Sequence, residues 1–105
     1  MADSIARVCR IDELAANSVR RLDFGDKAIC VYNIGGRFYA TDDVCSHGQS
    51  SLSEVGELNG EVIECGRHFG GFHVPTGKAV LPPCSVALRT YETVVRDGEL
   101  FVRVE

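Results

Sequence analysis

Two cysteines and two histidines form a pair of short Cys-then-His motifs in the middle of the chain. The first motif is Cys45-x-His47 and the second is Cys65-x-x-His68, with 17 residues between His47 and Cys65. We call them the first clip and the second clip. Thiolate and imidazole are both ligands of transition metals. The pattern therefore predicts a metal site whose ligands are Cys45, His47, Cys65 and His68.

Two kinds of metal centre suit this donor set. Two cysteines and two histidines are a common structural zinc set, but zinc fingers usually pair Cys with Cys and His with His, whereas each clip mixes the two. A structural zinc is also needed for folding, and this chain has enough β-pattern for a core of its own. A [2Fe–2S] cluster with both cysteines on one iron and both histidines on the other explains the mixed order. A zinc-stabilised binding module stays the alternative.

Length and charge limit the function further. A chain of 105 residues is enough for one domain, residues 1–105. Its formal net charge of −4 argues against nucleic acid or an anionic membrane as partner. Five cysteines without a secretory signal predict reduced thiols, and no apolar run is long enough to span a membrane. We therefore expect a cytoplasmic protein.

The rest of the chain reads as short β-runs separated by turns. The turn signals include Gly35-Gly36 and Asp97-Gly98, which are typical of two-residue hairpins. Residues 27–34 are β-branched and aromatic enough for a central strand. The pattern predicts an all-β fold, an antiparallel sandwich or small barrel, with one or two helical turns at 11–16. Strands are expected at 6–9, 18–24, 27–34, 37–41, 61–64, 72–74, 88–96 and 99–104.

The segments around the clips carry a resemblance that covers nearly the whole chain. They are Arg37-Phe38-Tyr39-Ala40 with Asp42, Phe69-Gly70-Gly71-Phe72, Val74-x-Thr76-Gly77-Lys78-Ala79, Pro82-Pro83-Cys84 and the closing residues 88–104. Together with the clips, they resemble the Rieske-type ferredoxins of bacterial aromatic-ring-hydroxylating dioxygenase systems.

This resemblance implies a structure and a function. The fold would be a Rieske-like antiparallel β-sandwich, with a small cluster-binding subdomain at about 43–84 formed by two loops. One [2Fe–2S] cluster would be held by the four clip residues. The protein would be a monomeric electron carrier without substrate chemistry of its own, between an NADH-dependent flavoprotein ferredoxin reductase and a terminal ring-hydroxylating oxygenase in aromatic compound degradation. A small electron-transfer subunit of another oxidoreductase complex is the alternative within the family.

Four residues near the clips differ from the high-potential Rieske proteins that this family also contains. Ser50 and Arg67 stand where those proteins carry a disulfide, and Gly70 and Phe72 stand where they carry Ser and Tyr hydrogen-bond donors. Hydrogen bonds to sulfur stabilise the more negative, reduced cluster and raise its potential. Without these donors we expect the lower end of the Rieske range, roughly −150 mV.

The remaining candidate residues have simpler interpretations. Cys9 and Cys30 lie in strand-like runs and are expected to be small core residues. Cys84 follows two prolines in a loop that, by the resemblance, leans over the cluster, and we expect it to pack there without being a ligand. His73 is expected to be a structural histidine. An acidic run is expected to be a solvated face, or else a docking surface for a basic partner; it comprises Glu54, Glu57, Glu61 and Glu64.

Overall fold

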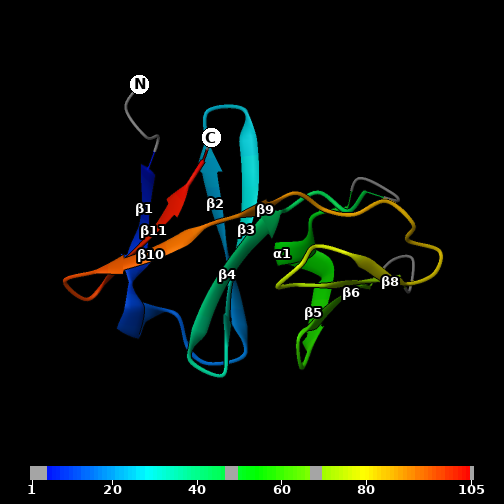
Figure 1. The fold of residues 1–105 in the computed structure, drawn as a ribbon, viewed down its shortest axis with the longest axis horizontal. Helices are drawn as coiled ribbons and strands as arrows, with labels where there is room; N and C mark the ends of the chain where they lie inside the picture. The colour runs from blue at the N-terminus through cyan, green and yellow to red at the C-terminus, as the bar shows by residue number, and fades with distance from the viewer. Residues whose placement is uncertain (1–4, 47–49, 67–69, 105) are drawn as a thin grey trace.

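The computed structural model describes residues 5–46, 50–66 and 70–104. Within these residues the strands form three antiparallel sheets, which follow one another along the long axis of the molecule (Figure 1). The expected all-β fold is confirmed. No helix in these ranges has the length and apolar content that crossing a bilayer requires.

Each sheet has a simple strand order. In the first sheet the order is β1 (Ile5–Arg10), β11 (Glu99–Arg103) and β10 (Thr93–Arg96). In the second sheet it is β2 (Ser18–Phe24), β3 (Lys27–Ile34), β4 (Arg37–Asp42) and β9 (Thr90–Tyr91). In the third sheet it is β5 (Gly56–Asn59), β6 (Val62–Cys65), β7 (Gly71–His73) and β8 (Ala79–Leu81).

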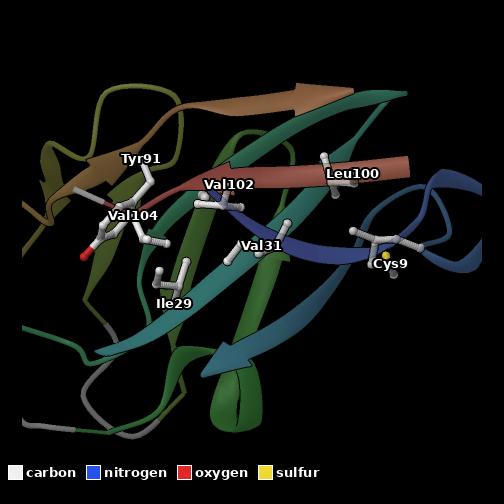
Figure 2. Close-up of a cluster of buried hydrophobic side chains, with 10 residues drawn as sticks. Cys9, Ile29, Val31, Tyr91, Leu100, Val102 and Val104 are labelled. Atoms are coloured by element: carbon white, nitrogen blue, oxygen red, sulfur yellow. The ribbon is translucent and has the colours of Figure 1, made fainter. Parts of the chain in front are cut away.

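Strand β3 separates the two hydrophobic cores, because successive side chains of a strand point to opposite faces. Ile29 and Val31 belong to the core between the first two sheets, whereas Cys30 and Tyr32 belong to the core beside the third sheet. Figure 2 shows the first of these cores between β3 and β11. The expectation of a central strand at 27–34 is therefore confirmed, and both faces of this strand are buried.

The third sheet places the second clip. Gly56 pairs with Cys65 and Ile63 pairs with Phe72, so β5, β6 and β7 form an antiparallel meander. Strand β6 ends at Cys65 and β7 begins at Gly71, and the second clip is the connection between them. The first clip follows β4 and leads into the one-turn helix α1 (Leu52–Val55).

The structure differs from the sequence expectations in its short elements. The helical turns expected at 11–16 are a single 3₁₀ turn, η1 (Ile11–Glu13), none of whose residues is buried. Leu14 is buried but already extended, so the apolar spacing does not form a helix face. Helix α1, strand β5 and strand β8 were not expected. Helix α1 and strand β5 lie in the acidic segment. In β5, Gly and Glu have low strand propensity, and pairing with β6 holds these residues extended.

Candidate metal centre

The first clip begins two residues after the buried Asp43. Cys45 is 1% exposed, and its backbone N–H donates to the carbonyl of Ser50 at 2.8 Å. The residues on either side of this pair, Val44 and Ser51, form an isolated antiparallel bridge. The loop is therefore closed at its base by main-chain pairing, with the cysteine directed into the protein.

The second clip is closed in the same way. Cys65 is fully buried, and its N–H donates to the carbonyl of Gly70, again at 2.8 Å and again five residues later. The N–H of Gly66 donates to the carbonyl of Val55 at 3.2 Å. A Cβ at Gly66 would lie 2.4 Å from that oxygen, so only glycine permits this approach to α1. The two clips are thus closed at the base in the same way, by a hydrogen bond from the backbone N–H of the cysteine.

The cysteines of the two clips lie in one buried cluster. Cys45 and Cys65 share it with Leu52, Ile63 and Phe72, which shield the sulfurs from water. His47 and His68, the other two expected ligands, lie outside the described residues, as does Arg67. The structure therefore brings the two thiols into one core and does not place the imidazoles.

A third cysteine lies beside these two. Cys84 is 6% exposed, and its thiol is hydrogen-bonded to Cys45 and lies near Cys65. Burial, together with the two neighbouring sulfurs, raises the pKa of the Cys84 thiol to about 11. A Cβ at Gly70 would lie 2.1 Å from the Cys84 sulfur, so the glycine makes room for this thiol. The expectation that Cys84 packs near the site agrees with these contacts.

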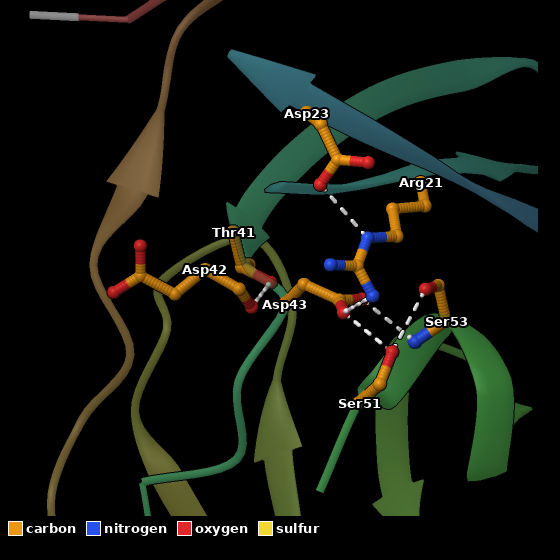
Figure 3. Close-up of polar contacts among 7 residues, drawn as sticks. All are labelled: Arg21, Asp23, Thr41, Asp42, Asp43, Ser51 and Ser53. Carbon is orange, nitrogen blue, oxygen red and sulfur yellow. Dashed lines mark hydrogen bonds and ion pairs between the residues drawn. The ribbon is translucent and has the colours of Figure 1, made fainter. Parts of the chain in front are cut away.

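The loop of the first clip is further held by a buried carboxylate that the sequence analysis did not single out. The side chain of Asp43 is fully buried, and it accepts hydrogen bonds from the Ser51 hydroxyl at 2.5 Å and the Ser53 N–H at 2.8 Å. The guanidinium of Arg21 lies 3.6 Å from the same carboxylate and 2.9 Å from Asp23 (Figure 3). A signal existed: an aspartate two residues before the clip, with Ser51 and Ser53 at the start of α1.

His73 lies away from the buried sulfurs. Its Nδ1 is hydrogen-bonded to the Thr76 hydroxyl at 2.9 Å and its Nε2 lies 3.2 Å from the Glu61 carboxylate. Both ring nitrogens are therefore engaged in contacts between β7 and its neighbouring turns. These contacts fit a structural histidine.

The other two cysteines are core residues, as expected. Cys9 lies in the first core and Cys30 in the second, and both are buried. Burial raises the pKa of Cys30 to about 12. The described residues include all five cysteines, and no disulfide joins any two of them.

The chemistry of the described donors fits a thiolate-bound metal group. Two cysteine sulfurs approach from two loops whose bases are fixed by main-chain hydrogen bonds, within an apolar cluster. Such a pair of thiolates holds one iron of a [2Fe–2S] cluster and equally half of a zinc site. Donor type and placement alone do not choose between them.

Comparison with known families decides the question. The Rieske [2Fe-2S] domain matches residues 4–92. The chain belongs to this family. The Rieske cofactor is one [2Fe–2S] cluster, so the zinc alternative is set aside.

Individual relatives of this Rieske domain agree with each other. The ferredoxin component of the p-cumate 2,3-dioxygenase system of Pseudomonas putida is 42% identical over 92% of this chain and 83% of the relative. Ferredoxin CarAc of Metapseudomonas resinovorans is 43% identical over 94% of this chain and 92% of the relative. Since such relatives are ferredoxin components, the expectation of an electron carrier instead of an enzyme is confirmed.

The fold comparison gives the same result. A chain from the complex of reduced oxygenase and oxidized ferredoxin in carbazole 1,9a-dioxygenase superposes with a TM-score of 0.92. The two are 41% identical, and the match covers 97% of this Rieske domain and 94% of that chain. The expected Rieske-like sandwich is confirmed by this match.

Proposed function

We propose that the protein carries single electrons from an NADH-dependent flavoprotein ferredoxin reductase to a terminal ring-hydroxylating oxygenase in aromatic compound degradation. One observation carries the proposal: nearly the whole chain superposes on a structure of a ferredoxin complexed with its oxygenase. The chain's relatives also include ferredoxin components of p-cumate and biphenyl dioxygenase systems.

The proposal assigns the four clip residues as cluster ligands. Cys45 and Cys65 would hold the inner iron, since their sulfurs are buried, and His47 and His68 would hold the outer iron. When bound, the cluster supplies one-electron chemistry at a low potential. The cluster-binding subdomain would comprise residues from about 43 to 84, and it would be part of a single domain of residues 1–105.

The protein's own residues would fix the ligands and exclude water. The main-chain hydrogen bonds of Cys45 and Cys65 hold both loops at their bases, so the sulfurs are positioned by the fold. Leu52, Ile63 and Phe72 keep water from the inner side, which strengthens every electrostatic interaction with the cluster. A rigid, preorganised environment of this kind reduces the rearrangement that accompanies a change of charge.

Exposed apolar side chains near the clips suit a short-lived partner contact. Val44 precedes Cys45 and is 44% exposed, and Val86 is 61% exposed. The Ser46 hydroxyl donates to the Val86 carbonyl at 2.6 Å, which ties these two segments together. A small surface of this kind fits brief redox encounters of a monomer better than a permanent assembly. The lack of disulfides among the described cysteines is consistent with the reducing cytoplasm.

Electron transfer can be tested with purified components. The holoprotein is mixed with NADH, a flavoprotein ferredoxin reductase and the carbazole 1,9a-dioxygenase oxygenase, and the cluster absorbance is followed by stopped flow. We expect the reductase to reduce the cluster and the oxygenase to reoxidise it. A cluster that the reductase does not reduce and the oxygenase does not reoxidise would contradict the proposal. Co-elution of the native protein with another oxidoreductase at all salt concentrations would favour the small-subunit alternative.

A further inference from the structure

Three buried sulfurs meet at the centre, and only two of them are assigned as ligands. The third belongs to Cys84, in the segment after β8, and its thiol is hydrogen-bonded to Cys45. We propose that the Cys84 thiol donates a hydrogen bond to the cluster-bound Cys45 sulfur and thereby raises the midpoint potential. The inference rests on the proposed ligand role of Cys45.

Ligation determines the direction of this hydrogen bond. A cysteine bound to iron is a thiolate and has no proton to give, so Cys84 must be the donor. Reduction adds negative charge to the cluster, and a donor to a ligand sulfur stabilises that charge more than the oxidised state. The surrounding residues are apolar, so this contribution is weakly screened. Cys84 is therefore a positioning residue that acts on the cluster through Cys45.

Two contacts keep the Cys84 thiol in place. On one side, Gly70 offers no side chain, and its Cα faces the Cys84 sulfur so closely that a Cβ there would lie 2.1 Å away. On the other side, the segment that carries Cys84 is tied to the first clip by the Ser46–Val86 hydrogen bond. The segment is also tied to the third sheet by the Leu88 N–H, which donates to the Gly77 carbonyl at 2.8 Å. The thiol is thus held between the two clip loops.

This donor changes the expectation drawn from Gly70 and Phe72. Those two residues lack the polar hydrogens that would raise the potential, but the space beside Gly70 is filled by a thiol that has one. A serine at position 70 would collide with Cys84 before it could donate. The midpoint potential should therefore lie above the lower end of the Rieske range, which is expected when neither position 70 nor position 72 supplies a hydrogen-bond donor.

The test compares two substitutions at Cys84 in the cluster-loaded protein. Cys84→Ala removes the donor, and Cys84→Ser replaces S–H with the stronger donor O–H. We expect the alanine variant to lower the equilibrium constant for one-electron reduction by about three- to tenfold, which is ~28–59 mV. We expect the serine variant to have a midpoint at or above that of the wild type. Midpoints are read from redox titrations followed by electron paramagnetic resonance.

The matched control is Cys30→Ala. Cys30 is a buried thiol of the same core, and the residue that exchanges a hydrogen bond with it is Tyr32. Its removal should reduce stability without moving the midpoint.

Three outcomes would overturn the inference. One is a midpoint potential of Cys84→Ala equal to that of the wild type. Another is a decrease of the midpoint potential that is the same in Cys84→Ala and Cys30→Ala. The third is a midpoint of Cys84→Ser below that of the wild type, which decides the matter even if the alanine variant does not load a cluster. No redox partner is used, so failure of the proposed electron transfer would leave this result intact.

Discussion

The carboxylate of Asp43 accepts a hydrogen bond from the backbone N–H of Ser53, with 2.8 Å between Oδ1 and N. These two residues flank the first clip, one directly after β4 and the other inside α1. The Leu52 N–H also donates to the Asp43 carbonyl, at 2.7 Å. The loop that carries Cys45 is therefore closed by one residue through both its main chain and its side chain.

Asp43→Ala should destabilise the protein and weaken cluster retention. The substitution leaves the Ser51 hydroxyl and the Ser53 N–H without their acceptor, and both contacts are partly buried. Hydrogen bonds to a charged group contribute about 1.5–3 kcal/mol each, so we expect the loss of these two to lower the free energy of unfolding by about 3–6 kcal/mol. Urea unfolding followed by circular dichroism measures the loss, and the visible absorbance measures retention of the cluster.

Asp23→Ala is the control for this prediction. Asp23 binds the same Arg21 guanidinium as Asp43, but it is exposed. Exposed ion pairs contribute little, about 0–1 kcal/mol. Equal effects of the two substitutions would show that Asp43 acts only through Arg21 and does not hold the first clip.

The assigned histidine ligands should differ sharply from His73. His47→Ala and His68→Cys should abolish the Rieske absorption and electron paramagnetic resonance spectra, because each removes an iron ligand. His73→Ala should leave both spectra nearly intact, since its ring contacts Thr76 and Glu61. Loss of the cluster on changing His73 alone would show that the second clip has been assigned wrongly.

Tyr91 should make stability fall at high pH. Burial, together with its hydrogen bond to Asp42, raises the pKa of Tyr91 to about 12, above the value near 10 of an unfolded tyrosine. Between pH 10 and 12 the unfolded state loses this proton and the folded state keeps it, so the free energy of unfolding falls as pH rises. Below pH 10 the contribution is constant.

Tyr91→Phe tests this sign directly. The variant loses the hydrogen bond to Asp42 and should be less stable at pH 8. Its deficit relative to the wild type should shrink as pH rises from 10 to 12, because phenylalanine does not titrate. A deficit that stays constant in urea unfolding across this range would contradict the pKa argument.

The sequence predicted the longer strands because their physical signals are local. Alternating and β-branched residues predicted β2 and β3 with the bounds that the structure gives. Positive φ at Asp97 and Gly98 agrees with the hairpin expected there. Strand β5 has no such signal. Glu57 and its neighbours are held extended by pairing with β6, and the residue types of the segment do not indicate this pairing.

The candidate metal site was predictable in its cysteines but not in the residues that surround them. The types and spacing of Cys45 and Cys65 indicated a metal, because few other roles require such a pair. Asp43 escaped notice, since one buried aspartate cannot be told from an exposed one without its partners. The close approach of Cys84 to Gly70 depends on how two distant loops meet, and spacing along the chain does not encode it.

The acidic run can now be tested as a solvated face. Glu57 on β5 lies directly opposite Glu64 on β6, and like charges in this position are destabilising. Glu57→Thr removes the repulsion and adds a residue with a higher strand propensity, so we expect stability to rise by about 0.2–1 kcal/mol in urea unfolding. Stopped-flow rates with the reductase and the oxygenase should not change at low salt, where charge effects are largest. A slower rate that converges with the wild type at high salt would instead assign this run to docking.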